Sequence, residues 1–432
     1  MSMTEDLDAR ARAILQANDR GGYTVPTARL YPYQWNWDSA FVALGFATFD
    51  RDRAWRELEM LLEGQWPDGM IPHILFRSDD PDYFPGPSVW RANLGPIPSG
   101  GISQPPVLAS VVRALVESGG EEDARRGAAM LGQIAKWHRW WHMARRPDGC
   151  PVIATVHPWE TGRDNCPDWT IGLDAMTVPG DLEPYTRMDV KHANPAQRPS
   201  KDQYDKFVTI IRAGRECGWD QKVLTETGPF LMADPGLHFI LLRADRDLLA
   251  MVRRFGGETD EIEGWVAAGV AGTDYLWNPA LDAFCARDVR SGAFSNGVSS
   301  VSALAFYGDA GTDAQRAAML AHIERIGGAA RYLMPSWDPA APMFEAQRYW
   351  CGPLWCQVNY MVSRGLAEAG HGALAERVRT DLGAVIEKSG FYECFDPMTG
   401  AGCIGTDFSW TAALWLAWAS PNASPNVQIR EN

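Results

Sequence analysis

Apolar residues recur at helical spacing along almost the whole chain. Met130, Ile134, Trp137 and Trp141 follow an i, i+4, i+7, i+11 pattern, which places them on one face of a helix. Comparable patterns, many with Ser, Thr or Asp before them and Gly after them, indicate about twelve helices. We expect these helices up to residue 18 and near residues 38–48, 51–65, 104–118, 130–141, 200–216, 234–255, 259–276, 295–306, 312–327, 353–369, 373–388 and 409–419.

Long connections rich in Pro, Gly and Trp separate some of these helices. The main ones run over residues 77–106, 150–199 and 336–353, and loops of this length are uncommon unless they have a function. Strand patterns are weak, and residues 152–156 give the best short one. Two separate helical bundles would require a polar linker, which is not evident. We therefore expect an all-α protein, an (α/α)6 barrel, with a single domain over residues 1–432 and loop or cap insertions at about 77–106 and 150–199.

The composition is that of a globular protein with an acidic balance. Apolar residues make up 46% of the 432 residues and charged residues 22%, which is enough for a large core. The net charge is −14 and no basic run occurs, so we expect neither nucleic acid nor a membrane surface as a partner. No stretch approaches the roughly 18–20 apolar residues of a membrane span, and residues 1–16 lack the apolar core of a signal peptide. We expect a cytoplasmic protein with free thiols.

Tryptophan is unusually frequent, with 19 residues against 16 Phe and 12 Tyr. Some of these indoles fall in helix patterns and are typical of core filling. Others lie in or beside the Pro/Gly-rich connections, next to side chains that form hydrogen bonds. An exposed indole beside carboxylates and amides suits a sugar ring, although indoles can also simply pin long loops to the core. The loop tryptophans are Trp35, Trp37, Trp66, Trp90, Trp159, Trp169, Trp337, Trp350 and Trp355.

Two loop-to-helix junctions carry polar side chains that could contact a ligand. Asp38 follows the aromatic run from Tyr31 to Trp37, close to the start of a predicted helix. Its carboxylate could accept hydrogen bonds from sugar hydroxyls, or it could simply favour the positive end of the helix dipole. Gln104 follows Gly100-Gly101, and its amide could bind a ligand or satisfy backbone groups at the helix start.

Two further carboxyl groups lie among aromatic residues at distant positions in the chain. Asp164 follows Trp159 in a loop, and burial against aromatic side chains would keep such a carboxyl protonated near neutral pH. It is a candidate general acid, or an ordinary loop Asp paired with Arg163. Glu393 lies among aromatic residues near the other end of the chain. A closed helical ring would bring it close to the first helix as a candidate general base, whereas the segment alone favours a solvated loop Glu.

A metal site has little support in the sequence. His138 and His142 are spaced i, i+4 on a predicted helix, but the motif lacks the Glu of a zinc protease and no third ligand is apparent. No phosphate-binding loop, dinucleotide-binding motif or nucleophile elbow is evident either. We therefore expect no metal and no organic cofactor.

Several segments together resemble glycoside hydrolase family 63, and more narrowly the bacterial mannosylglycerate and glucosylglycerate hydrolases. They occur in order from about residue 24 to residue 418, so the resemblance covers nearly the whole chain. The segments are YPYQWNWDSAFVALG, QWPDGMIPHILF, DYFPGP, SGGISQPP, PWETGRDN, QRPSKDQYD, YWCGPLWC, YECFDPMTG and SWTAA.

The resemblance implies an (α/α)6 barrel with long loops over its mouth and hydrolysis of an α-glycosidic bond with inversion. It implies Asp164 as the general acid and Glu393 as the general base. Positions that match the sugar subsite are Tyr31, Trp35, Trp37, Asp38, Gln104, Trp159, Glu160, Trp350 and Trp355. Positions that match the residues holding the glycerate are Tyr83, Arg198, Tyr204 and Tyr349.

One position departs from the resemblance. The similar hydrolases have Gln-Gln immediately before the Ser-Trp that begins the last predicted helix, and the second Gln helps to bind the aglycone. This chain has Asp407 and Phe408 there. Because a phenyl group replaces an amide, we expect the part of the site that binds the aglycone to differ from that of the similar hydrolases.

The sequence therefore favours hydrolysis of a small glucoside or mannoside, with a glucosylglycerate- or mannosylglycerate-like substrate first. An α-glucosidase that acts on another small α-glucoside or disaccharide is the alternative. A sugar epimerase or isomerase would use a His pair, and only His157 lies in a loop close to these motifs. A carbohydrate-binding protein without activity is also conceivable, although both carboxylates are present. The partner is a small carbohydrate, and a homo-oligomer is compatible with the sequence.

Overall fold

The structure is a computed structural model and describes residues 3–80 and 83–423. In this part of the chain, helical segments form an inner ring, each contacting the next, with the last contacting the first. In spatial order they are α2 (Asn36–Phe46), α5 (Leu108–Ser118), α11 (Pro235–Phe255), the 3₁₀ helix η5 (Ser300–Ala305), α14 (Cys356–Glu368) and α16 (Ser409–Leu414). An outer helix packs against each of them: α3 (Arg51–Leu62), α6 (Glu121–Ala144), α12 (Asp260–Gly272), α13 (Asp313–Ala329), α15 (Gly372–Ser389) and α1 (Met3–Asn18). The predicted (α/α)6 ring is confirmed.

Local sequence explains where many of these helices begin and end. Asp234 caps α11 by accepting a hydrogen bond from the backbone of Leu237, and Gly256 ends the helix in a left-handed conformation with φ 82°. The inner helix α2 is buried along its whole length, which fits its apolar sequence. Gly45 lets α2 approach α16 closely, because a Cβ there would lie 2.4 Å from the Cα of Ala413.

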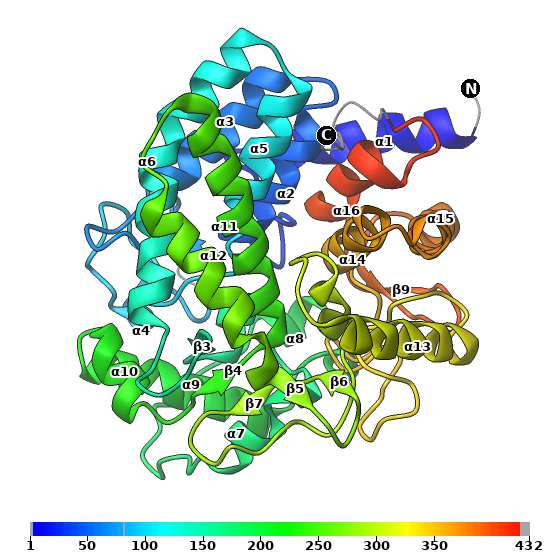
Figure 1. Ribbon diagram of the computed structural model, residues 1–432. Helices are drawn as coiled ribbons and strands as arrows, with labels where there is room; N and C mark the ends of the chain where they lie inside the picture. Colours follow the sequence, from blue (N-terminus) through cyan, green and yellow to red (C-terminus); the bar gives the residue numbers. More distant parts are fainter. Residues whose placement is uncertain (1–2, 81–82, 424–432) are drawn as a thin grey trace.

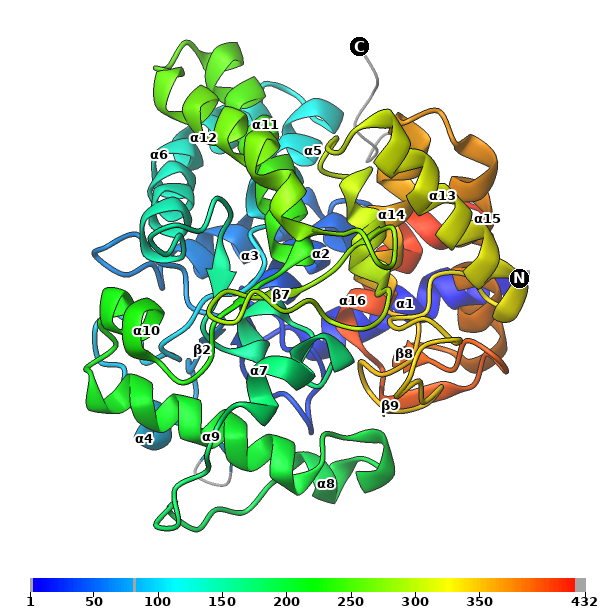
Figure 2. The same ribbon diagram turned by 60° about the horizontal axis from the view of Figure 1, so that its bottom comes forward.

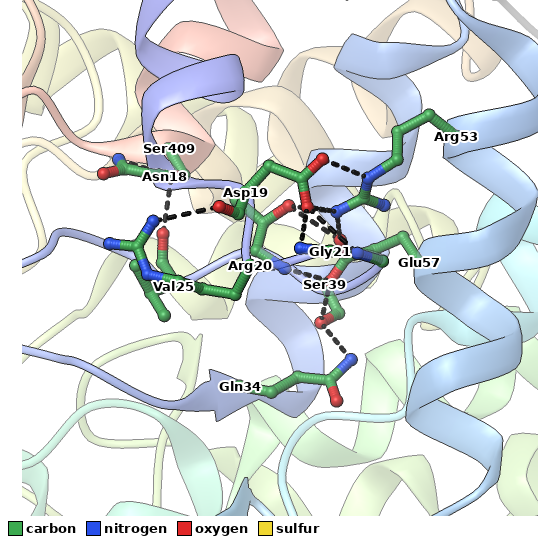
Figure 3. A network of polar contacts seen from close by, with 12 residues as sticks. Asn18, Asp19, Arg20, Gly21, Val25, Gln34, Ser39, Arg53, Glu57 and Ser409 are labelled. Carbon is green, nitrogen blue, oxygen red and sulfur yellow. Dashed lines mark hydrogen bonds and ion pairs between the residues drawn. The ribbon is translucent and has the colours of Figure 1, made fainter. Parts of the chain in front are cut away.

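The first outer helix, α1, packs against α16, the inner helix that closes the ring on α2. Figure 1 shows α1 in blue and α16 in red side by side, although they come from opposite ends of the sequence. Asn18, at the end of α1, donates a hydrogen bond to Ser409 Oγ over 3.0 Å, and Ser409 donates in turn to the carbonyl of Val25 (Figure 3). In the same network Arg53 of α3 pairs with Asp19 and Glu57. These contacts fix the start of α16, which borders the cavity described below.

The remaining elements gather mainly at one end of the ring, which is turned forward in Figure 2. Short helices there are α4 (Pro87–Trp90), α7 (Thr170–Asp174), α8 (Asp189–His192) and α10 (Gln221–Thr227), with the longer α9 (Lys201–Glu216). Single turns are the 3₁₀ helices η1 (Pro158–Thr161), η2 (Pro167–Trp169), η3 (Pro195–Gln197) and η4 (Thr273–Leu276), and the π-helix η6 (Trp415–Ala419) follows α16.

Strands are short and all paired antiparallel. The two-residue strands are β1 (Gln34–Trp35) with β2 (Ile74–Leu75), β3 (Ala154–Thr155) with β4 (Met232–Ala233) and β7 (Arg287–Asp288), and β5 (Trp277–Asn278) with β6 (Ala283–Phe284). Strand β3 lies within the strand expected at 152–156. The hairpin of β8 (Tyr392–Phe395) and β9 (Gly402–Thr406) was not predicted.

The helix expected at 295–306 is instead the short 3₁₀ helix η5. Ser302 donates its hydroxyl to the carbonyl of Phe284 in β6 over 2.6 Å, so η5 is tied to a strand distant in sequence. None of the described helices combines the length and the apolar character that a membrane span needs. The single domain over residues 1–432 and the cap boundaries stay predictions, since residues 1–2, 81–82 and 424–432 lie outside the described part.

Candidate active site

A cavity open to solvent lies at the end of the ring where inner helices begin, with about 830 Å³ of empty space that includes the solvent at its mouth. The first turn of α2, the chain just before α5 and the starts of α14 and α16 all contribute to its wall. The positive ends of these helix dipoles therefore face the cavity and favour negative charge there. Phe408, at the start of α16, also lines the wall and is only 1% exposed.

Most of the residues singled out in the sequence line this cavity. They come from segments as far apart as residues 31 and 393, and the ring brings them together. They are Tyr31, Trp35, Trp37, Asp38, Tyr83, Gln104, Trp159, Asp164, Arg198, Tyr204, Tyr349, Trp355 and Glu393. Their individual roles stay predictions.

Glu160 and Trp350 lie behind the cavity wall and do not line it. Both carboxylate oxygens of Glu160 accept hydrogen bonds from the buried Arg145, so this carboxylate is already satisfied by the protein. The indole of Trp350 stacks on that of Trp355, with ring centroids 3.9 Å apart. In the structure these two residues support the wall that others present to the cavity.

Asp164 is held through the backbone on both sides. Arg163 forms buried ion pairs with Asp168 over 2.7 Å and with Asp234, the cap of α11, over 2.6 Å. On the other side Asn165 accepts a hydrogen bond from the backbone nitrogen of Trp350 over 3.0 Å. The flanking anchors therefore place the acidic side chain in the cavity.

The close fit around Asp164 also requires a glycine. Gly162 has φ 69°, and a Cβ at this position would lie 2.4 Å from the indole of Trp37. The Asp164 carboxyl itself forms no side-chain hydrogen bond within the described residues. Burial raises its pKa to about 7, although the nearby Arg198 acts in the opposite direction. It is therefore suited to hold a proton near neutral pH.

Glu393 is held differently, on strand β8 next to a β-bulge. The carboxylate Oε1 accepts a hydrogen bond from the hydroxyl of Tyr31 over 3.1 Å. Its Oε2 is buried and has no hydrogen-bond partner in the described part of the chain. Burial raises the pKa of Glu393 to about 7, whereas Arg198 and the Tyr31 hydrogen bond favour the ionised form. The charge of Asp164 raises this pKa further, so the two groups disfavour simultaneous ionisation.

A third carboxyl, Asp38, shares the cavity. It lies in the first turn of α2 and is buried. Burial, together with the charge of Glu393, holds the pKa of Asp38 well above its usual range. The site can therefore hold protons on several carboxyl groups near neutral pH.

Arg198 is the one guanidinium that lines the cavity in the described residues. It donates to the hydroxyl of Tyr31 over 2.9 Å and to Asp189 over 2.9 Å, and it lies 4.1 Å from the ring centroid of Tyr349. Asp189 also pairs with Arg187, which fixes the orientation of Arg198. A guanidinium held in this way is suited to bind a carboxylate.

Comparison with known proteins identifies the family. Residues 31–411 match the family described as "Mannosylglycerate hydrolase MGH1-like glycoside hydrolase domain". A mannosylglycerate hydrolase from Thermus thermophilus is 44% identical over 416 residues, which cover 95% of this chain and 99% of the relative. A glucosylglycerate hydrolase from Mycolicibacterium hassiacum is 32% identical over 436 residues, with 95% and 97% covered. The chain belongs to the MGH1-like glycoside hydrolases.

A solved structure of this family extends the match to the fold. The crystal structure of the GH63 mannosylglycerate hydrolase from Thermus thermophilus in complex with Tris and D-glycerate has a TM-score of 0.91 to this chain, at 41% identity. The match covers 94% of this chain and 98% of that one. The resemblance to family 63 read from the sequence is confirmed.

Some residues that line the site of this glycoside hydrolase were not predicted. His73 and Trp410 lie in segments that carried the resemblance, so the sequence offered a signal for both. Asp189 lies in the long connection 150–199 with no pattern around it, and only the structure reveals that it holds Arg198. His138 and His142 lie away from this cavity and both contact the buried carboxylate of Asp245.

Proposed function

We propose that this protein hydrolyses the α-glycosidic bond of a small glucoside or mannoside with a carboxylate on its aglycone, of the glycerate type, and that it inverts the anomeric configuration. The observation that carries the proposal is the pair of carboxyls, the partly buried Asp164 and the buried Glu393, in one cavity with pKa values raised to about 7. The relatives' names, mannosylglycerate and glucosylglycerate hydrolase, support the substrate class.

The two carboxyls have the chemistry that inversion needs. Asp164, protonated, would donate to the glycosidic oxygen as the bond to the aglycone breaks. Glu393, ionised and held by Tyr31, would take a proton from the water that attacks the anomeric carbon from the opposite face. The free Oε2 of Glu393 is the group that would bind this water. Room for the water requires the two carboxyls to lie about 6.5–9.5 Å apart.

The remaining groups have roles in binding. Trp35, Trp37 and Trp355 would hold the sugar ring with Asp38, and Arg198 would bind the aglycone carboxylate. No metal and no organic cofactor enters this scheme. A cytoplasmic location and the oligomeric state stay predictions.

A different aglycone is the second candidate, and Phe408 favours it. This buried phenyl lines the cavity where an amide would serve a polar aglycone better. An epimerase is less suited to this site, because one histidine, His73, lines the cavity within the described residues. His157 is buried elsewhere, and its ring accepts from the backbone nitrogen of Trp159 and contacts the carbonyl of Phe207.

Proton NMR of the purified protein with a substrate panel tests the proposal. The panel contains 2-O-α-mannosylglycerate, 2-O-α-glucosylglycerate, and α-glucosides with uncharged aglycones. We expect free sugar from a glycerate glycoside, with the β-anomer appearing first and the α-anomer only by mutarotation. Initial release of the α-anomer would contradict inversion, and hydrolysis confined to uncharged α-glucosides would contradict the glycerate-type aglycone.

A further inference from the structure

We propose that Gln197 is a positioning residue for Glu393, and that it makes the alignment of the catalytic base depend on the docking of the turn 195–198. This inference rests on the proposed hydrolysis and adds a residue that does not line the cavity. Gln197 is the last residue of η3 and lies in the cap connection, far in sequence from the hairpin that carries the base.

The base lies opposite an irregularity in its hairpin. Tyr392 pairs with Thr406 and Cys394 pairs with Cys403, so Glu393 faces an extra residue on β9. Bulges of this kind re-aim side chains next to active sites. A Cβ added at Gly405, within the bulge, would lie 3.7 Å from the free Oε2 of Glu393. The backbone of the bulge therefore lies directly beside the atom that would bind water.

The bulge is strained and has to be held. Ile404 has φ 69°, a left-handed conformation that is unfavourable for a β-branched residue. Such conformations persist only where surrounding contacts impose them, at a cost of about 1–3 kcal/mol. The Oε1 of Gln197 accepts a hydrogen bond from the backbone nitrogen of Ile404 over 3.0 Å. Gln197 thus satisfies a backbone donor at the strained residue.

The next residue in the chain reaches the same base from the other side. Arg198 donates to the hydroxyl of Tyr31, which donates to Oε1 of Glu393. Gln197 and Arg198 therefore act on the base together. Gln197 acts through the backbone of β9, and Arg198 acts through Tyr31 on the carboxylate of Glu393. An aglycone carboxylate that bound Arg198 would stabilise the turn 195–198, and this turn would then stabilise the bulge at Ile404. Aglycone binding and base alignment are coupled in this arrangement.

Two substitutions separate the hydrogen bond from the bulk of the side chain. Gln197→Met keeps the length of the side chain and removes the acceptor, whereas Gln197→Glu keeps an acceptor oxygen. An α-glycosyl fluoride is the diagnostic substrate, because fluoride departs without a proton and leaves no aglycone to bind. Its turnover reports on the water and the base. The glycerate glycoside that the wild type hydrolyses is measured in parallel.

We expect Gln197→Met to lower kcat at least about tenfold on both substrates, because small displacements of a catalytic group are costly. KM for the fluoride should stay near the wild-type value, and Gln197→Glu should restore most of the lost kcat. Gln315→Met is the matched control: Gln315 Oε1 likewise accepts from a backbone nitrogen, that of Thr312, in the outer helix α13. This control should lower the melting temperature without lowering kcat.

Wild-type kcat on the fluoride in Gln197→Met would overturn the inference. So would a defect seen only as a raised KM for the glycerate glycoside, since that would assign Gln197 to aglycone binding. A loss of kcat that Gln197→Glu does not restore would also overturn it. If the wild type hydrolyses neither substrate, the proposed function fails and the inference fails with it.

Discussion

The surroundings of Asp164 and of Glu393 differ in how they hold a carboxyl group. The loop around Asp164 is anchored by buried ion pairs of its neighbour Arg163, and the acid itself receives no side-chain hydrogen bond in the described structure. Glu393 lies beside a strained bulge and accepts a hydrogen bond from Tyr31. Burial raises the pKa of each to about 7. The Tyr31 hydrogen bond favours the ionised form of Glu393, and no side-chain hydrogen bond does the same for Asp164. This difference is the reason why we propose Glu393 as the base and Asp164 as the acid.

Removing either carboxyl gives the largest expected effect and tests the division of roles. Asp164→Asn and Glu393→Gln should each lower kcat on the glycerate glycoside by about a thousandfold, the middle of the range of about 10²–10⁴-fold for general acids and bases. On an α-glycosyl fluoride, Asp164→Asn should retain most activity, since no proton has to be donated, whereas Glu393→Gln should stay inactive. Equal losses on the fluoride would contradict the assignment of Asp164 as the acid.

The pH dependence of the melting temperature shows whether Asp164→Asn still folds normally. Ionising a carboxyl whose pKa the fold raises from 3.8 to about 7 destabilises the fold, by at most about 4 kcal/mol for this shift because Asp164 is only partly buried. The penalty is absent below pH 3.8, grows as the pH rises and is complete above pH 7. Asp164→Asn should therefore melt at a higher temperature than the wild type at pH 8, and the difference should shrink towards pH 4. A lower melting temperature at pH 8 would indicate a disturbed fold.

A smaller effect is expected from Tyr31→Phe, which removes the hydrogen bond that distinguishes the base. Because this bond lowers the pKa of Glu393, its loss should raise that pKa. In the pH profile of kcat/KM, activity falls on the acidic side as Glu393 gains a proton, so the acidic limb should move to higher pH. The hydroxyl of Tyr31 also contacts the hydroxyl of Tyr349 over 3.1 Å. Tyr349→Phe is therefore the matched control, because it leaves the hydrogen bond between Tyr31 and Glu393 intact. An acidic limb that moves equally in both variants would contradict the role of Tyr31.

The sequence predicted features that depend on local rules better than those that depend on distant partners. The start of α11 at Asp234-Pro235 follows from capping chemistry, and the loop motif with Asp164 stands out by its aromatic neighbours. Glu160 was expected in the sugar subsite, but Arg145 already satisfies its carboxylate inside the protein. The bulge at Ile404 could not be foreseen, because the Gln197 that holds it lies 207 residues away. Glu160 and Asp164 of the same loop thus lie in different surroundings, one paired with Arg145 inside the protein and the other lining the cavity, because of contacts that only the fold creates.

The smallest expected effect concerns the aglycone side of the cavity and does not change Asp164 or Glu393. Phe408 contacts the ring of Trp410, with centroids 4.5 Å apart, and the edge of Tyr31. Phe408→Gln would place an amide at this edge, and one added hydrogen bond of about 0.5–1.5 kcal/mol predicts a two- to tenfold gain in kcat/KM for a glycerate glycoside. The rate on an α-glycosyl fluoride, which has no aglycone, should stay close to that of the wild type. If both substrates change by the same factor, Phe408 acts on the base through Tyr31 rather than on the aglycone.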